Sequence, residues 1–260
     1  MRMRWHDLCF LHWRVDPARL APLLPAGLTL DTFDDAAWIG VVPFRMSDVS
    51  VRLTPRVRRL ADFAELNVRT YVTAAGKPGV WFFSLDATQP VAVRVVRSIF
   101  HLPYHDARIT LRRDGDSYAY ASTRPERHGP QAALTVGYRP TGPAYHATPG
   151  TVDHFLIERY CLYTTDRSRR PLRQEVDHVP WSVQPAAARV VHCTVTEPFG
   201  IPLDGPPIAH FSASLDVVAW RQQRVTGPRR GLARRAAPRP ARSSYGNAAV
   251  ARRVSPLTPR

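Results

Sequence analysis

The sequence predicts an α+β protein built mainly of antiparallel β-strands, with a few short helices. Runs of β-branched and aromatic residues follow one another along most of the chain, and clusters of glycine, proline and aspartate separate them. Helical spacing of apolar residues appears in only three short segments. Strands that occur in runs, rather than in alternation with helices, argue against a parallel βαβ fold.

The clearest element is a hairpin in residues 65–86. Side chains on a strand alternate between its two faces, so Glu65, Asn67 and Arg69 share one face, while apolar residues and a threonine share the other. Residues 75–79, Ala-Gly-Lys-Pro-Gly, predict the turn that joins this strand to the next one. The polar face of the first strand is therefore a candidate lining for a cavity.

Several strands and one short helix are expected before this hairpin. Asp16 and Pro17 predict the N-cap and the first position of a helix that ends before Pro25. Strands are expected at 8–15, 28–33, 36–44 and 47–53, and an exposed loop at 54–63. Such successive strands should form a meander.

Two further helices and seven strands are expected after the hairpin. Apolar residues at helical spacing predict a helix within 89–100, and Thr151 predicts the cap of a helix over 151–160. Residues 113–116, Arg-Asp-Gly-Asp, predict a tight hairpin turn. Strands are expected at 107–112, 117–122, 132–138, 160–165, 174–178, 189–196 and 214–220, with a polar loop at 124–130.

The basic charge of the chain is concentrated near its C-terminal end. The formal net charge is +15, and residues 221–260 hold eleven arginines and no acidic residue, which leaves +4 for residues 1–220. This Arg/Pro/Ala-rich segment cannot bury enough apolar surface to offset its ordering entropy, so we expect a folded domain over 1–220 and a disordered tail over 221–260. The tail could bind nucleic acid weakly through phosphate contacts, but a solvated extension is the expected interpretation.

The spacing of the cysteines and the hydropathy of the chain indicate the cellular compartment of the protein. Cys9, Cys161 and Cys193 are widely spaced and form no Cys-x-x-Cys pair, which favours buried thiols in a reduced protein. No apolar run has the length of a signal-peptide core or of a membrane span. We therefore expect a cytoplasmic protein without a membrane partner.

Residues 65–105 resemble the central segment of the acetoacetate decarboxylase-like superfamily. The shared pattern is a glutamate, a glycine-containing turn, an aromatic strand and Arg-x-Ile-x-x-x-Pro over 97–103. Residues 13–31 resemble the entry segment of that superfamily, and residues 1–220 as a whole are most similar to its uncharacterised YqjF-like branch. The resemblance implies a closed β-sheet or barrel with a few short helices.

The resemblance does not extend to the lysines of the decarboxylases. In those enzymes the two positions after the proline are lysines, one of which forms a Schiff base with the keto acid; here they are Tyr104 and His105. The single lysine of this chain, Lys77, falls in the predicted turn, where a solvated ammonium group is a poor nucleophile. Schiff-base decarboxylation is therefore not expected, and no cofactor is indicated.

The residues at the resembling positions still form a coherent pocket. Glu65 matches a glutamate that the resemblance places in the cavity, so we predict Glu65, Tyr104 and His105 as catalytic residues. A carboxylate, a phenol and an imidazole could exchange protons with a ligand and polarise its carbonyl group.

Other polar residues are candidates for binding the substrate. Arg97 and Arg69 could each hold a carboxylate, because a guanidinium group pairs with it bidentately. Asn67 shares the polar face of the strand, and His6 lies near the position of an arginine in the decarboxylases, so both are further candidates. An alternative is that Arg97 and Glu65 form an internal ion pair that organises the barrel.

Metal and nucleophile motifs have little support. His101 and His105 have the spacing of a zinc-binding pair on a helix, but Pro103 disfavours a helix there, so no metal site is expected. The charged residues of the helix predicted over 151–160 are interpreted as a solvated face. No Gly-x-Ser-x-Gly elbow, phosphate-binding loop or dinucleotide fingerprint is present.

The sequence thus predicts a protein that binds a small carboxylate or carbonyl ligand in a β-barrel cavity. Lysine-independent acid–base chemistry of the lyase, isomerase or hydrolase type is one outcome. The alternative is a non-catalytic ligand-binding or scaffold protein. Apolar edge strands leave a homo-oligomer open as a further possibility.

Overall fold

Fourteen strands join into one branched sheet in the computed structural model, which describes residues 1–50, 62–88 and 101–225. The strands are β1 Arg2–Val15, β2 Thr29–Leu30, β3 Ala37–Ser50, β4 Phe63–Ala74, β5 Lys77–Ala87, β6 Tyr104–Asp106, β7 Arg108–Asp114, β8 Ser117–Arg124, β9 Ala132–Pro140, β10 Cys161–Thr165, β11 Pro171–Asp177, β12 Gln184–Cys193, β13 Ile208–Ala219 and β14 Gln223–Arg224. The α-helices are α1 Pro17–Leu20 and α4 Val152–Ile157, and the 3-10 turns are η1 Ala21–Leu23, η2 Glu126–His128 and η3 Glu197–Phe199.

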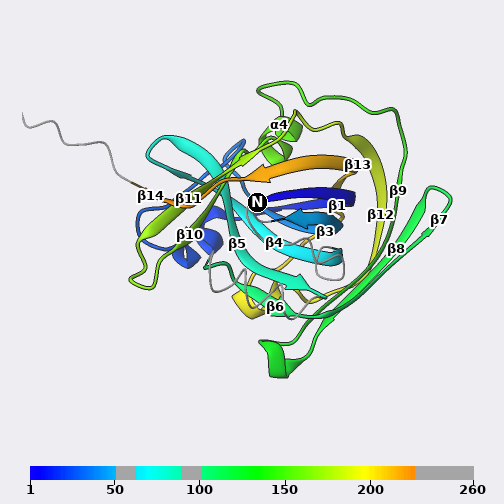
Figure 1. The fold of residues 1–260 in the computed structure, drawn as a ribbon, viewed down its shortest axis with the longest axis horizontal. Helices are drawn as coiled ribbons and strands as arrows, with labels where there is room; N and C mark the ends of the chain where they lie inside the picture. The colour runs from blue at the N-terminus through cyan, green and yellow to red at the C-terminus, as the bar shows by residue number, and fades with distance from the viewer. Residues whose placement is uncertain (51–61, 89–100, 226–260) are drawn as a thin grey trace, which may run out of the picture. The chain divides into compact units, whose positions relative to one another are not determined.

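Part of this sheet closes into a ring. The strands β11, β10, β5, β4, β3, β1 and β13 are neighbours in that order, and a short pairing of β11 with β13 joins the two ends. The pairings β10–β5 and β5–β6 are parallel, and the other pairings among the described strands are antiparallel. Figure 1 shows these strands wrapped around a common interior. The predicted fold class, mainly antiparallel with a few short helices, is confirmed.

The strands β12, β9, β8 and β7 continue the sheet beyond β13 and cover one side of the ring (Figure 1). A hydrophobic core separates these outer strands from the ring, with Trp13 and Ile39 on the ring side and Tyr120 and Leu134 on the outer side. A second core cluster lies inside the ring and includes Phe10. The ring strands are therefore buried on both faces where the outer strands cover them.

A β-bulge in β1 decides which of its side chains point into the ring. In β1, Met3 and Trp5 face the interior cluster, but beyond Asp7 the interior residues are Leu8 and Phe10. The register of β1 against β3 shifts between His6 and the following segment, and Asp7 has a φ of 54°. An extra residue at a bulge reverses the alternation of faces. The bulge therefore keeps large apolar side chains inside the ring on both sides of Asp7, from Met3 to Phe10.

Several local predictions are confirmed. The N–H of Ala18 donates to the side chain of Asp16, which caps α1 as expected. Thr151 accepts a hydrogen bond from the N–H of His154 and caps α4. The hairpins β4–β5 and β7–β8 form at the predicted turns. The turn of the first hairpin is shorter than expected, because Lys77 already belongs to β5.

Other boundaries are corrected. Pro43 lies inside the continuous strand β3, so the two strands predicted over 36–53 are one strand as far as Ser50. The helix predicted over 151–160 ends at Ile157. Chain beyond the predicted boundary at 220 still pairs in the sheet, because β14 joins β11.

Some predictions fall on residues that the structure does not describe. The helix within 89–100 lies outside the described residues, and so does the tail from 226 onward.

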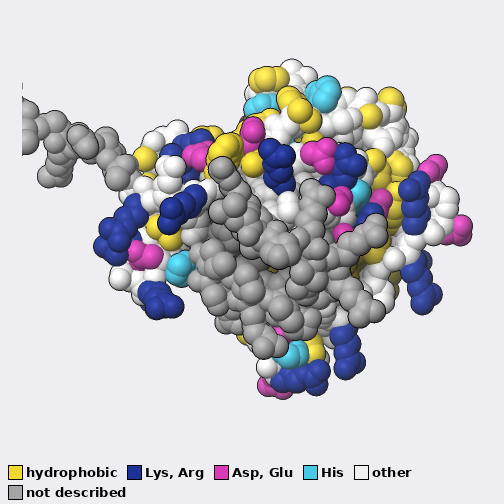
Figure 2. All heavy atoms as spheres, viewed as in Figure 1, with side chains coloured by type: hydrophobic (Ala, Val, Ile, Leu, Met, Phe, Trp, Pro, Cys, Tyr) yellow, Lys and Arg dark blue, Asp and Glu magenta, His cyan; other side chains and the backbone are white. Residues whose placement is uncertain are grey.

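In the described part of the chain, no helix combines the length and the apolar character needed to cross a membrane. On the face drawn in Figure 2, the Lys and Arg side chains of described residues are scattered over several elements and do not gather in one patch. The three cysteines are free thiols, two of them buried and Cys193 half-buried.

We predict that Gly79→Ala will destabilise the ring at the parallel β5–β10 pairing. A Cβ atom at Gly79 would lie 2.6 Å from Sγ of Cys161 and 2.8 Å from the Tyr163 ring. Overpacking of this kind costs about 1–3 kcal/mol. Urea denaturation should therefore give a lower free energy of unfolding than for the wild type.

Gly137→Ala is the matched control, because the nearest atom to its new Cβ would be 3.8 Å away, at ordinary contact distance. Equal stability of the two variants would contradict the packing described here.

Candidate functional site

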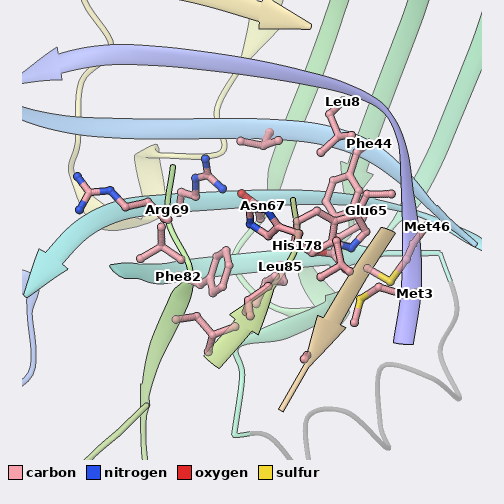
Figure 3. A pocket seen from close by; sticks show the side chains of 18 of the residues that line it. Met3, Leu8, Phe44, Met46, Glu65, Asn67, Arg69, Phe82, Leu85 and His178 are labelled. Carbon is pink, nitrogen blue, oxygen red and sulfur yellow. The ribbon is translucent and has the colours of Figure 1, made fainter. Parts of the chain in front are cut away.

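The interior of the ring holds a cavity of about 120 Å³ that is lined mainly by apolar side chains. Residues of β1, β3, β4, β5, β6, β10, β11 and β13 contribute to its wall. Figure 3 shows Phe44, Phe82 and Leu85 among the apolar lining residues. Ligand sites are commonly apolar cavities with a small number of placed polar groups, and this cavity has that composition.

The strand β4 supplies the polar stripe. Glu65, Asn67 and Arg69 all line the cavity and project from the same face of β4, as the alternation in the sequence predicts (Figure 3). The pairing of β4 with β3 is regular over this stretch, so no bulge reverses the faces. The stripe is therefore where the sequence places it.

Glu65 and Tyr104 form a buried hydrogen-bonded pair at one end of the stripe. The Tyr104 hydroxyl donates to Oε2 of Glu65 at 2.9 Å, and only 2% of Glu65 is exposed. Burial disfavours the charged carboxylate and raises the pKa of Glu65 to about 8, a shift that the hydrogen bond from Tyr104 opposes and the nearby Asp86 charge reinforces. Glu65 is therefore protonated at neutral pH, with one carboxyl oxygen available to donate a hydrogen bond.

Tyr104 reaches the cavity because the short strand β6 pairs with β5 in parallel. Tyr104 lies beside Leu85 in this pairing, and both line the cavity. Its neighbour His105 lies beside Asp86, and the ring Nδ1 of His105 is 2.9 Å from the carbonyl oxygen of His128 in η2.

Adjacent residues of a strand face opposite sides, so His105 is not part of the cavity wall. The predicted grouping of Glu65, Tyr104 and His105 is therefore corrected. The structure brings the first two together and directs the third toward η2.

A buried ion pair lies on the opposite face of β5. An Nη1 atom of Arg124 lies 3.3 Å from Oδ1 of Asp86, and both side chains are almost completely buried. Burial raises the pKa of Asp86 to about 6, against the opposing effect of the Arg124 charge. The Tyr120 hydroxyl donates to the carbonyl oxygen of Glu65, so the outer strands also contact the backbone behind the cavity.

Arg69 occupies the other end of the stripe and is partly exposed. Its Nη2 lies 3.4 Å from the carbonyl oxygen of Leu156, which also accepts a hydrogen bond from the Tyr71 hydroxyl. The guanidinium carbon is 5.5 Å from the centre of the Phe10 ring. Stacking on an aromatic ring leaves the edge of a guanidinium group free to bind a carboxylate.

Two lining residues were not singled out from the sequence. Arg159, just after α4, lines the cavity and pairs with Asp31 at 2.6 Å. His178 also lines the cavity (Figure 3). Its Nδ1 lies 2.8 Å from the carbonyl oxygen of Val179. Neither belongs to a motif, and only the closure of the ring brings β11 and the end of α4 to β4.

The remaining predicted site residues lie elsewhere. His6 does not line the cavity; its Nε2 is 2.8 Å from Oγ of Ser47. Arg97 lies outside the described residues, so neither its proposed substrate contact nor its ion pair with Glu65 can be placed. Lys77 pairs with Glu175 at the start of β5 and does not line the cavity.

Within the described ranges, no three His, Cys, Asp or Glu side chains come together as a metal site would require. The carboxylates around α4 are bound to neighbours and are not a solvated face. Asp153 accepts a hydrogen bond from the Tyr145 hydroxyl, and Glu158 accepts one from the N–H of Trp181.

Comparison with known proteins places the chain in a family. The model of the DUF2071 family, described as an uncharacterized conserved protein, matches residues 2–216. The uncharacterized protein YqjF of Bacillus subtilis (strain 168) is 40% identical over 221 residues, which cover 85% of this chain and 90% of YqjF.

Solved structures with the same fold are more distant in sequence. The enduracididine biosynthesis enzyme MppR complexed with pyruvate has a TM-score of 0.61 at 15% identity, over 86% of this chain and 90% of MppR. An acetoacetate decarboxylase-like enzyme from Sphingomonas wittichii RW1 has a TM-score of 0.60 at 15% identity, over 87% and 93% of the two chains.

Acetoacetate decarboxylase from Legionella pneumophila has a TM-score of 0.56 at 13% identity, over 86% of this chain and 87% of that enzyme. At these identities the likeness establishes the fold. The acetoacetate decarboxylase-like fold expected from the sequence is confirmed.

We predict that Glu65→Gln will change how stability depends on pH. The folded protein holds the Glu65 proton up to about pH 8, whereas an ordinary glutamate releases it near 4.5. Folding therefore takes up a proton between these values, and this group lowers the free energy of unfolding as the pH rises, by up to about 1.4 kcal/mol per pH unit. Glutamine does not titrate, so the variant should gain stability relative to the wild type from pH 5 to pH 8.

Urea denaturation at each pH measures the difference. Glu126→Gln is the control, because Glu126 is exposed. If the Glu65→Gln and wild-type curves stay parallel over this range, the carboxyl group does not have the raised pKa.

Proposed function

We propose that this protein, which belongs to the DUF2071 family of uncharacterised conserved proteins, binds a small organic acid or carbonyl compound in the ring cavity. The observation that carries the proposal is the Glu65–Tyr104 pair, a carboxyl group buried among apolar side chains at the wall of that cavity. The pyruvate complex of MppR, which has the same fold, agrees with a ligand of this class.

The proposed chemistry is acid–base catalysis at a carbonyl group without lysine. Glu65 in its protonated form donates a proton to the carbonyl oxygen of the ligand as negative charge develops there. Tyr104, which already donates to Glu65, orients the carboxyl group. Enolisation, dehydration and hydrolysis all need such a general acid.

His178 is the proposed proton acceptor, in place of His105. It lines the same cavity, and the contact of its Nδ1 with the Val179 carbonyl favours the neutral tautomer that carries the proton on Nδ1. That tautomer leaves Nε2 with a free lone pair. In an enolisation, Nε2 would take a proton from the carbon beside the carbonyl group while Glu65 protonates the oxygen.

A non-catalytic receptor is the second candidate function. Two hydrogen bonds that hold Glu65 in place favour it. The Tyr104 hydroxyl donates to the carboxyl group of Glu65, and the Tyr120 hydroxyl donates to its backbone carbonyl. Such a carboxyl group could serve only to bind a carbonyl oxygen or to join β4 to β6. Binding without turnover would identify this case.

We predict that keto, hydroxy or aromatic acids will stabilise the protein against thermal unfolding. We also predict that Glu65→Gln and Tyr104→Phe will lower the rate of hydrogen exchange in a bound ligand, whereas the loss of a hydroxyl group away from the cavity will not. A thermal-shift screen identifies the ligands, since stabilisation grows with ligand excess over Kd. NMR in D₂O then measures exchange of the hydrogens beside the carbonyl group. Removal of a positioned general acid typically lowers a rate about 10²–10⁴-fold, so Glu65→Gln should exchange far more slowly than the wild type. Tyr104→Phe keeps the acid and loses the hydrogen bond that orients it, so its exchange rate should also fall.

The pH profile provides a second readout. Because the acid form of Glu65 is the active one, the exchange rate should fall as the pH rises above about 8. Tyr138→Phe is the control, because its hydroxyl donates to the carbonyl of Asp7 away from the cavity. Exchange that is unchanged in Glu65→Gln would refute the catalytic role, and absence of any stabilising acid or carbonyl compound would refute the binding role.

A further inference from the structure

The polar groups that β4 contributes to the cavity are spread along that strand and are not gathered at one point. Glu65 and Arg69 lie at the two ends of the stripe with Asn67 between them (Figure 3). Arg69 lies four positions after Glu65, which at ~3.3 Å per residue is about 13 Å along β4.

Arg69 is held at its end of the stripe and does not lean toward Glu65. Its Nη2 lies 3.4 Å from the carbonyl of Leu156, and its guanidinium carbon is 5.9 Å from the ring of Tyr71, the next residue on that face beyond Arg69. Gly40 lies beside Arg69 on β3, and a Cβ there would come within 3.2 Å of the Arg69 side chain and of His12. A glycine at this position gives the long side chain the room to lie along the wall.

The charge of Arg69 has no acidic counterpart in the described part of the chain. None of the ion pairs found there includes Arg69, and its Nε is buried without a hydrogen-bond partner. Arg159, the other arginine of the cavity, is already paired with Asp31. An anionic group of the ligand is the natural partner for a guanidinium group in this position.

Along β3, β4 and β5 the wall between the two ends is apolar apart from one amide. Phe44 pairs with Glu65 across β3 and β4, Val42 with Asn67, and Leu85 also lies beside Asn67. The Asn67 amide is the one polar group of this stretch, and its Oδ1 is buried without a hydrogen-bond partner. The ligand segment between the ends should therefore be mostly hydrocarbon.

We infer that the cavity takes an elongated oxo acid, with its carboxylate at Arg69 and its carbonyl oxygen at Glu65, separated by an apolar chain. This inference rests on the proposed function and narrows its ligand class. If the side-chain ends are as far apart as the backbone positions of Glu65 and Arg69, about 13 Å, a hydrogen bond of about 2.8 Å at each end leaves about 7 Å between the two polar groups of the ligand. A 2-oxo acid such as pyruvate carries both groups on adjacent carbons and cannot contact both ends.

A chain-length series tests the inference by isothermal titration calorimetry. The compounds are pyruvate, 4-oxopentanoate, 5-oxohexanoate and 7-oxooctanoate, with octanoate and 2-octanone as analogues that lack one polar group. We predict that affinity rises along the series and that 7-oxooctanoate binds at least about tenfold more tightly than pyruvate and than either analogue, since a charge-assisted bidentate contact is worth about that factor.

Variants of the two end residues identify which group of the ligand each residue binds. Arg69→Met should weaken 7-oxooctanoate about tenfold or more and leave 2-octanone unchanged. Glu65→Leu should weaken 7-oxooctanoate and 2-octanone and leave octanoate unchanged, and Glu65→Gln, which keeps a donor, should retain most of the affinity. Thermal denaturation of each variant establishes that it is folded.

The outcomes separate the inference from the proposed function. If pyruvate binds as tightly as 7-oxooctanoate, or if Arg69→Met does not discriminate between the acid and the ketone, the elongated ligand is refuted while a small-acid site survives. If no compound of the series binds, the inference and the binding role proposed for the cavity both fail.

Discussion

A carboxyl group enclosed by apolar side chains is the constraint on which the rest of this site depends. Glu65 can remain inside the ring because Tyr104 donates to it and because its proton stays bound at neutral pH. An unpaired carboxylate in the same place would cost several kcal/mol of desolvation. The short parallel strand β6, which carries Tyr104, is therefore as important to the cavity as the long strands that form its wall.

The outer strands contribute to the same constraint from behind. Tyr120 of β8 bonds the backbone carbonyl of Glu65, and Arg124 of the same strand pairs with Asp86, whose charge raises the Glu65 pKa further. The covering of the ring by β7, β8, β9 and β12 thus has an electrostatic effect on the cavity in addition to burying a second core. Fold and site are coupled through these few contacts.

The sequence predicted correctly which side chains face the cavity where a strand is regular. It did not do so where contacts with neighbouring elements decide the orientation. Glu65, Asn67 and Arg69 were predicted on one face because β4 has no bulge against β3. In β1 the bulge at Asp7 reverses the faces, and no property of that aspartate alone announces the change. The same limit explains His178 and Arg159, which are brought to the cavity by ring closure and helix placement.

The sequence by itself determined the strand-rich fold class, the capped starts of α1 and α4, the hairpin β4–β5 and the polar stripe, because each depends on contacts within a few residues of chain. Only the tertiary structure decided that Tyr104 meets Glu65 while His105 faces η2, since the parallel pairing of β6 with β5 sets which of two adjacent side chains enters the ring. Long-range pairing fixes such an orientation, and local sequence patterns carry no record of it.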